Sequence, residues 1–342
     1  MPAKATIKDV ARLAEVSPST VSRALHDNPR ISEAVRQRVR EVAQALDFHP
    51  NQMARGLVQR ETRVVGVLFA EPASESMGHP FYPAVLQGLG QVAGERRYHM
   101  LLSTGAENLS AEAAMRDIAD SGYASGLICL TTRTAPDDTP RSVTLPVVEI
   151  GRPLRPRQSF YVDNDNVRAG RDATRHLLKR GHRRILFLGY DRRFIMMASR
   201  LEGFRQAMAD AGAPVNEQWI VPARMMENVP DFPHLQEIFR ADDRPTAVVS
   251  MDDPLSIGLS SFLLTLGLSV PADVSIVSFN NTLAGQYHSP ALTSIDVHPR
   301  ELGAHAMALL LDILKGKVTQ PTHLEVPFTL VERDSVAAPP RG

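Results

Sequence analysis

The sequence predicts a chain of two parts that differ in fold class, a small all-α head and a larger α/β body. Near the N-terminus, three short stretches place apolar side chains at helical spacing. From Arg63 onward, short apolar strands alternate with helical stretches, a pattern typical of parallel sheets. The chain has 342 residues, 43% of them hydrophobic, which is enough for two or three domains.

Three helix starts follow one another in the head, each marked by a hydroxyl side chain that can cap free backbone N–H groups. The first is a capping box at Thr6–Asp9, and its helix ends near Leu13. Ser17, followed by a proline, begins a second helix that runs from Pro18 to about Leu25. Ser32 begins a third, which runs to Leu46. The apolar residues that we expect on the inner faces are Ile7, Val10, Ala11, Ala14, Val21, Ala24, Leu25, Val35, Val39, Val42, Ala43 and Leu46.

The turn between the first two helices is only three or four residues long, which is typical of a helix-turn-helix unit. In such a unit the second helix enters the major groove of DNA. Arg23 on this helix can make the two-bond contact with guanine, while Ser19 and Thr20 suit phosphate or sugar. The alternative is that Arg23 is an ordinary solvated arginine. The outward residues of the second helix are Ser17, Pro18, Ser19, Ser22 and Arg23.

The head is also the basic part of the chain. Residues 1–63 hold 11 Lys or Arg and 7 Asp or Glu, a net charge of +4, and the other 279 residues carry −4. A basic head on a mildly acidic body indicates that the head meets a polyanion such as nucleic acid. The alternative is ordinary variation in surface charge.

A break at His49–Asn51 separates the third helix from a short segment of helical character, residues 52–58. This segment is too short to be stable alone in water, and Gly56 weakens it further. DNA can order it if an apolar side chain enters the minor groove and unstacks a base step. Leu57 is the candidate for that wedge; the alternative is a linker whose Leu57 packs on the body.

The head resembles the LacI/GalR family of bacterial repressors. The match is an ordered set of motifs: TIKDVA at residues 6–11, VS at 16–17, TVSRAL at 20–25, Asn28, IS at 31–32, VR at 35–36, PN at 50–51 and ARGL at 54–57. The resemblance implies that Leu57 opens the centre of a pseudo-palindromic operator. Pro18 departs from the family pattern, which leaves the operator sequence open. The DNA contacts that the resemblance implies are Thr6, Ser17, Pro18, Ser19, Thr20, Ser22, Arg23, Asn28, Ala54, Arg55 and Leu57.

The body is predicted to form two α/β lobes, because two sets of strands alternate with helices. A ligand then belongs in the cleft between the lobes, at the carboxyl ends of the strands. The first set of predicted strands is 64–69, 98–104, 126–130 and 146–150, and the second is 184–188, 219–221, 246–250 and 274–279. The predicted helices are 83–97, 111–121, 167–180, 199–211, 253–266 and 300–314.

The resemblance to the family continues through the body. The matching stretches are HPFY at 79–82, GHRRI at 181–185, RLEGF at 200–204, DD at 252–253 and SPALT at 289–293. The resemblance implies a two-lobed core like that of periplasmic binding proteins, in which the chain crosses between lobes three times. We expect these crossings near Asp163, Leu292 and Gln320.

Domain boundaries follow from these motifs. We predict a helix-turn-helix domain at 1–49, a hinge helix at 50–61 and a core for effector binding and dimerisation at 62–338. The N-lobe takes about 62–163 and 293–320, and the C-lobe about 164–292 and 321–338. The tail after Val331 has no leucine heptads, so we expect a homodimer without a tetramer-forming zipper.

Candidate ligand residues come from the loops that follow the strands. Phe81 and Tyr82 can stack on a sugar face or a ring, and Arg200 can donate several hydrogen bonds. Asp253 and Asn280 can hold sugar hydroxyls. The resemblance places ligand contacts at these five positions.

Each of these assignments has a structural alternative. Phe81 can be a core residue, and Asp253 can be the N-cap of the helix that contains Pro254. Asn281, which follows Asn280, can simply form the turn.

The motifs YVDNDN at 161–166, SFNN at 278–281 and TSID at 293–296 resemble the family branch that regulates maltose and other α-glucoside genes. An aromatic side chain with Asp, Asn and Arg suits a neutral sugar, although Arg200 alone does not exclude a sugar phosphate or a purine. We expect a repressor of carbohydrate-utilisation genes that the ligand releases from DNA. A ligand that strengthens DNA binding would use the same residues. The sequence therefore does not decide whether the ligand weakens or strengthens DNA binding.

Other functional classes have little support in the sequence. Residues 88–94 are glycine-rich but do not form the nucleotide motif G-x-G-x-x-G. Hydrolase and metalloprotease motifs are missing, so we expect that the protein is not an enzyme. His176 and His182 do not have the spacing of metal ligands, and we expect no metal and no cofactor. A secreted sugar-binding protein would share the body, but residues 1–8 lack the apolar stretch of a signal peptide and the head would be unexplained. The single Cys129 excludes an internal disulfide and favours the cytoplasm.

Overall fold

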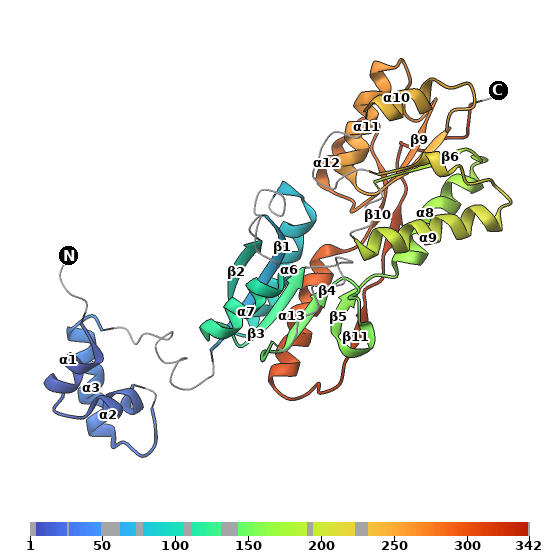
Figure 1. Ribbon diagram of the computed structural model, residues 1–342. Coiled ribbons are helices and arrows are strands. Elements are labelled where there is room, and N and C mark those ends of the chain that lie inside the picture. The colour runs from blue at the N-terminus through green and yellow to red at the C-terminus, as the bar shows by residue number, and fades with distance from the viewer. Residues whose placement is uncertain are drawn as a thin grey trace. The chain divides into compact units, whose positions relative to one another are not determined.

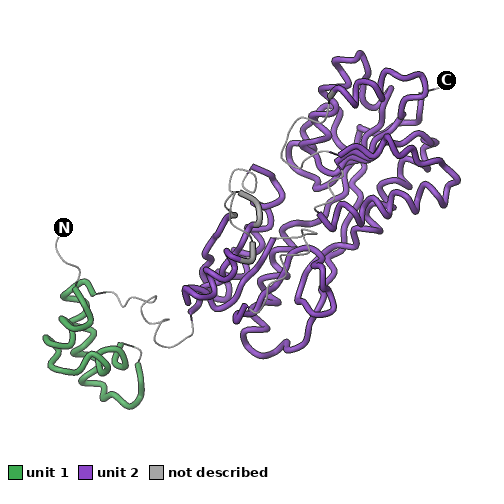
Figure 2. Tube along the Cα trace, viewed as in Figure 1, with its two compact units in different colours: residues 1–60 green, residues 61–342 purple. Residues whose placement is uncertain are grey.

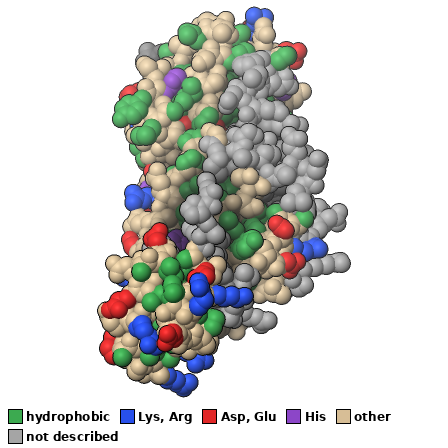
Figure 3. Space-filling model, turned by 90° about the vertical axis from the view of Figure 1, so that its left-hand side faces the viewer, with side chains coloured by type: hydrophobic (Ala, Val, Ile, Leu, Met, Phe, Trp, Pro, Cys, Tyr) green, Lys and Arg blue, Asp and Glu red, His purple; other side chains and the backbone are tan. Residues whose placement is uncertain are grey.

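The computed structural model describes residues 5–25, 27–48, 62–72, 78–105, 111–130, 143–189, 194–222 and 232–340. The chain divides into two compact units, the head at residues 1–60 and the body at residues 61–342 (Figure 2). The side that Figure 3 draws carries acidic and basic side chains interspersed rather than one large patch of a single charge.

The head is a bundle of three helices, α1 (Ile7–Leu13), α2 (Pro18–Ala24) and α3 (Glu33–Ala45) (Figure 1). These helices lie within one residue of the predicted bounds. Ile7 was expected inside, but it is 36% exposed. Helical side chains tilt toward the N-terminal end, so the first residue of α1 projects past the packed region. The buried core comprises Val10, Ala11, Ala14, Val21, Ala24, Val39 and Ala43.

The first lobe of the body is built on a six-stranded parallel sheet in the order β11-β5-β4-β3-β1-β2 (Figure 1). The helices α6 (Phe81–Glu95) and α13 (Pro299–Leu314) cover one face, and α7 (Ala111–Ser121) covers part of the other. Its strands are β1 (Val64–Pro72), β2 (His99–Gly105), β3 (Gly126–Leu130), β4 (Val147–Ile150), β5 (Phe160–Asp163) and β11 (His323–Glu325).

The second lobe has a six-stranded sheet in the order β12-β10-β9-β8-β6-β7, parallel except for the antiparallel pair β10 and β12. The helices α8 (Asn166–Lys179) and α9 (Ile195–Asp210) pack on one face, and α10 (Phe232–Arg240) and α11 (Asp253–Thr265) on the other. A short α12 (Leu283–Tyr287) follows β9. The strands are β6 (Ile185–Leu188), β7 (Ile220–Val221), β8 (Ala247–Ser250), β9 (Ser275–Phe279), β10 (Thr293–Asp296) and β12 (Thr329–Val331).

The chain passes between the two sheets three times: between β5 and α8, between β10 and α13, and between β11 and β12. The first crossing falls at Asp163, where it was expected. The second and third come later than Leu292 and Gln320. The reason is that β10 still pairs with β9, and β11 with β5, before the chain leaves each sheet.

Two helix pairs approach each other so closely that only glycine fits between them. A Cβ atom at Gly170 in α8 would overlap the backbone of Arg200 in α9, and one at Gly203 would overlap the backbone of Val167. In the first lobe, Gly88 and Gly303 play the same part between α6 and α13. The contact at Gly170 fixes the backbone that carries Arg200.

Candidate functional site

The start of α2 is shaped by a cluster of hydroxyl groups. The Ser17 Oγ accepts a hydrogen bond from the backbone N–H of Thr20 at 3.1 Å, so Ser17 is the N-cap that the sequence predicts. The Ser17 hydroxyl also lies 2.8 Å from that of Ser19 and 2.9 Å from that of Thr20. Pro18, Ser19 and Arg23 are exposed. The outward face of α2 is therefore available for contact with another molecule.

Three more predicted DNA contacts occupy different positions in the head. Thr6 is exposed and forms the start of the predicted capping box, since its backbone N–H donates to Asp9 at 3.0 Å. Asn28 shapes a loop, because its Oδ1 accepts from the backbone N–H of Arg30 at 3.0 Å. Ser22 is half-buried on α2. The hinge residues Ala54, Arg55 and Leu57 lie outside the described residues.

Arg200 is buried in the second lobe beside the first crossing, with 3% of its surface exposed. Its Nε donates to Oδ1 of Asn166 at 2.9 Å, and its Nη1 donates to the carbonyl oxygen of Met251 at 3.3 Å. The guanidinium carbon lies 4.1 Å from the ring centre of Phe279, a cation–π contact. Burial lowers the pKa of Arg200 to about 10, which leaves the side chain charged at neutral pH.

Asp163 connects this arginine to the first crossing. Its Oδ1 accepts from the side-chain amide of Asn166 at 3.0 Å and from the backbone N–H of Asn164 at 2.8 Å. Its Oδ2 accepts from the backbone N–H of Arg152 at 3.0 Å. Burial raises the pKa of Asp163 to about 6, although these hydrogen bonds and the charge of Arg200 act in the opposite direction. Asn166 thus links the crossing to the guanidinium.

Asp252, and not Asp253, is the N-cap of α11. Its Oδ1 accepts from the backbone N–H of Leu255 at 2.7 Å, and it is 2% exposed. The alternative role that the sequence left open for Asp253 is therefore wrong. Proline fits either of the first two helical positions, and here Pro254 takes the second, so the cap lies one residue earlier.

The carboxylate of Asp253 is engaged within the second lobe. It accepts from the hydroxyl of Ser294 at 3.0 Å and from the backbone N–H of Thr282 at 2.5 Å, and none of its surface is exposed. Burial raises its pKa. Asp253 therefore ties α11 to β10 and to the loop before α12, and its predicted contact with an effector stays a prediction.

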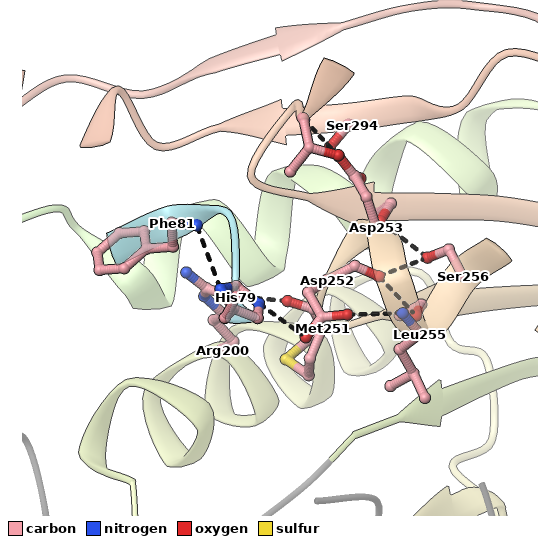
Figure 4. Close-up of polar contacts among 12 residues, drawn as sticks. His79, Phe81, Arg200, Met251, Asp252, Asp253, Leu255, Ser256 and Ser294 are labelled. Atoms are coloured by element: carbon pink, nitrogen blue, oxygen red, sulfur yellow. Dashed lines mark hydrogen bonds and ion pairs between the residues drawn. The ribbon is translucent and has the colours of Figure 1, made fainter. Parts of the chain in front are cut away.

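His79 lies opposite Asp252, across the boundary between the lobes (Figure 4). Its Nε2 is 3.4 Å from Oδ2 of Asp252, and the imidazole is almost completely buried. Its Nδ1 accepts the backbone N–H of Phe81 at 3.3 Å. The motif at 79–82 points to its aromatic residues as candidate contacts and does not single out His79. The position of His79 after β1 and before α6 was a usable signal.

The two predicted aromatic contacts have different surroundings. Phe81 is half-buried and packs against the hydrophobic cores of both lobes. Tyr82 is 7% exposed, belongs to the core of the first lobe and makes edge-to-face contacts with Phe69 and Phe81. Phe81 is therefore the aromatic side chain that lies at the junction.

Asn280 and Asn281, which follow β9, have different roles. Both have positive φ angles, 88° for Asn280 and 48° for Asn281, which suits a tight turn. The Asn281 side chain donates to Asp296 at 2.9 Å and accepts from Arg333 at 2.6 Å, so it holds the turn together. The Asn280 side chain is half-buried and hydrogen-bonds to none of the described residues.

Among the described residues, no group of three or more His, Cys, Asp or Glu side chains is arranged so that it could hold a metal ion. Within the same residues, no helix combines the length and the apolar character that a bilayer span requires.

Comparison with known proteins identifies the family. Residues 6–51 match the family of bacterial regulatory proteins of the lacI type, and residues 174–336 match a periplasmic binding protein-like domain. The chain is 31% identical over 315 residues to the transcriptional regulator MalR of Streptococcus pneumoniae, which covers 90% of this chain and 92% of that protein. The chain belongs to the LacI family. It is a DNA-binding transcriptional regulator with a helix-turn-helix head and a two-lobed α/β core.

Other relatives cover almost the whole chain at similar identity. The repressor PurR of Vibrio cholerae is 31% identical over 339 residues, with 97% of this chain and 98% of that protein covered. A solved complex of the regulator CelR with cellobiose has a TM-score of 0.74 at 27% identity, covering 97% and 99% of the two chains. The lac repressor dimer bound to operator reaches a TM-score of 0.82 at 21% identity, covering 98% and 100%, and supports the fold. MalR and PurR carry the names of transcriptional regulators.

Proposed function

We propose that this LacI-family protein is a cytoplasmic homodimeric repressor of carbohydrate-utilisation genes. Its affinity for operator DNA is set by a small neutral sugar bound between the lobes, with maltose or a related α-glucoside as the first candidate. The observation that carries the proposal is the group of buried polar side chains where the lobes meet. His79 comes from the first lobe, and Arg200 and Asp252 come from the second.

The DNA-binding part of the proposal rests on α2. Arg23 is exposed on this helix and forms no ion pair with the residues that the structure describes. Its guanidinium can therefore make the two-bond contact with a guanine in the major groove. Ser19 and Thr20, near the start of the same helix, suit phosphate contacts because helix N-termini favour anions. Ala54, Arg55 and Leu57 remain the proposed hinge contacts.

The effector part rests on hydrogen-bonding capacity. We assign effector contacts to Phe81, Tyr82, Arg200, Asp253 and Asn280, and we add Asp252, which lies at the junction beside His79. The aromatic ring can pack on the apolar face of a sugar, while the polar groups can bind hydroxyls. CelR was solved as a complex with cellobiose, and other relatives carry the name PurR. A purine or a sugar phosphate therefore remains the second candidate.

The proposed mechanism is a population shift between two arrangements of the lobes. One arrangement sets the two heads of the dimer at the spacing of the operator half-sites, and the other does not. A sugar changes DNA affinity only as far as it prefers one arrangement, and a coupling of roughly 1–3 kcal/mol is typical. We expect the sugar to favour the arrangement that releases DNA. Dimerisation without a zipper is part of the same proposal, because a pseudo-palindromic operator presents two half-sites.

The experiment combines selection with titration. The intact protein selects duplexes from a random pool at moderate ionic strength, and calorimetry then measures binding of maltose, maltotriose and trehalose. We expect a selected palindromic sequence, micromolar or tighter binding of one of these sugars, and weaker DNA binding in its presence. Failure to select any sequence contradicts the operator role. A silent response to all three sugars removes the α-glucoside assignment.

A further inference from the structure

One contact joins the two lobes through a pair of buried polar side chains far apart in sequence. His79 is 3% exposed and Asp252 is 2% exposed. Their facing atoms, Nε2 and Oδ2, are 3.4 Å apart (Figure 4). Buried polar groups are expensive unless they are hydrogen-bonded, so this pair is a defined feature of the junction.

We propose that His79 and Asp252 together recognise one hydroxyl group of the effector, which enters between them. His79 is then a specificity-determining residue contributed by the first lobe. This inference rests on the proposed function, because it names the chemical group that the ligand presents at the junction.

The hydrogen-bonding partners of the pair determine which chemical group fits. The His79 Nδ1 accepts the backbone N–H of Phe81, so the imidazole hydrogen is on Nε2 and points toward Asp252. The Asp252 Oδ1 is occupied by the N–H of Leu255, which leaves Oδ2 as the acceptor that faces His79. A bridging atom must accept from the imidazole and donate to the carboxylate at the same time.

A hydroxyl group meets both requirements with a single oxygen atom. A phosphate oxygen at neutral pH does not donate to a carboxylate and is repelled by the charge of Asp252. A purine ring nitrogen either donates or accepts, but does not do both. The pair therefore favours a hydroxyl group at this point of the ligand over a phosphate group or a purine ring nitrogen.

The length of the contact links ligand binding to the position of the lobes. A charge-assisted N–H···O bond is typically about 2.7–2.9 Å long, so the 3.4 Å separation between Nε2 and Oδ2 is a weak direct interaction. An inserted hydroxyl with two bonds of normal length requires these atoms to move apart by roughly 1 Å. Because the atoms belong to different lobes, the hydroxyl changes the spacing of the lobes while strengthening the link between them.

The test measures sugar affinity of full-length variants by calorimetry, first with maltose. His79→Leu removes the donor, whereas His79→Gln keeps an N–H donor near the position of Nε2. Asp252→Asn keeps an oxygen that can cap α11 but replaces the acceptor opposite His79 by a side chain that can present a donor. His305→Leu, at an exposed position on α13, is the matched control. Urea unfolding of each variant verifies that it is folded.

We expect His79→Leu to weaken maltose binding about tenfold or more, and His79→Gln to stay within a few-fold of the wild type. His305→Leu should be unchanged. The variant with both His79→Leu and Asp252→Asn should lose little more than either single variant, because both remove the same bridge. Full maltose affinity in folded His79→Leu overturns the inference, and so do additive losses in the double variant.

Titration of the wild type with other ligands distinguishes a failure of the hydroxyl bridge from a failure of the proposed function. If the wild type ignores maltose and trehalose but binds cellobiose, the α-glucoside assignment fails, and the same variants titrated with cellobiose decide the hydroxyl bridge. If the wild type binds glucose 6-phosphate more tightly than every neutral sugar, the same variants titrated with glucose 6-phosphate decide the bridge, since that ligand also carries hydroxyl groups. If the wild type binds a purine base, which has no alcohol hydroxyl, but no sugar and no sugar phosphate, the hydroxyl bridge is overturned. In those cases operator selection still tests the DNA-binding role.

Discussion

The side-chain amide of Asn164 donates to the carbonyl oxygen of Val326 at 2.8 Å and to that of Val297 at 3.1 Å. Asn164 lies in the first crossing between the lobes, Val297 in the second and Val326 in the third. One buried amide therefore holds all three connecting segments together. The backbone N–H of the same residue donates to Asp163, which is linked through Asn166 to Arg200. A continuous polar chain thus joins the proposed effector contact to the hinge.

Asn164→Ala is expected to destabilise the body by about 2 kcal/mol, because it removes the donor from two carbonyl groups in a buried setting. Asn164→Asp has the same shape but presents oxygen atoms to both carbonyls, so it should be at least as harmful. Urea unfolding of the intact chain measures both effects. Wild-type stability in Asn164→Asp would show that the amide does not hold the crossings.

Gly170→Ala is expected to impair the effector site without touching a polar group. The added methyl group overlaps the backbone of Arg200, so α8 and α9 must separate, at a cost of about 1–3 kcal/mol. The displaced guanidinium should then bind the effector more weakly, which calorimetry measures. Gly94→Ala in α6 is the matched control, because its methyl group meets no atom within 4 Å and should stabilise the helix by up to about 1 kcal/mol. Equal behaviour of the two variants would exclude the proposed role of Gly170.

Arg23→Ala is expected to reduce specific DNA binding by about 1–3 kcal/mol while affecting nonspecific binding much less. The comparison is Arg12→Ala, which removes the same charge from an exposed position on α1. Fluorescence anisotropy with a selected duplex and a scrambled duplex measures both affinities at two salt concentrations. If the two variants lose the same affinity on both duplexes, Arg23 contributes charge only and does not read a base.

Elements that depend on local sequence patterns were predicted better than elements that depend on contacts between residues far apart in the sequence. The bounds of β3 and α7 match the predictions, because a buried strand and an amphipathic helix have patterns of their own. The short strands β5, β10, β11 and β12 were not predicted. The pairing of β11 with β5 and of β12 with β10 depends on residues far away in the sequence, and strands of three or four residues carry no clear alternation.

The same limit applies to the candidate site. Arg200 was predicted from the RLEGF motif, and the structure places it in a buried polar network. His79 was passed over because its partner, Asp252, lies 173 residues away on the other lobe. The choice between Asp252 and Asp253 depended on which residue caps α11, and the proline beside them permits either. Local patterns therefore identified the loops and Arg200, but not the contact between His79 and Asp252.

The buried carboxyl group of Glu149 in β4 is expected to make the free energy of unfolding depend on pH. Burial raises the pKa of Glu149 to about 7, above its usual value of 4.5, with Cys129 as its neighbour on β3. Because the folded state holds this proton more tightly than the unfolded state, the contribution of Glu149 to stability is lost as the pH rises from about 4.5 through about 7. Asp163, with its pKa raised to about 6, acts in the same direction over a lower range.

Glu149→Gln should therefore stabilise the chain at pH 8 by about 2–3 kcal/mol relative to its effect at pH 5, where the wild-type carboxyl group is already protonated. Urea unfolding of both proteins at the two pH values measures the difference. Glu237→Gln on α10 is the control, because that side chain is exposed and should show little dependence on pH. The same stability change at pH 5 and pH 8 would mean that Glu149 ionises in the folded protein without cost.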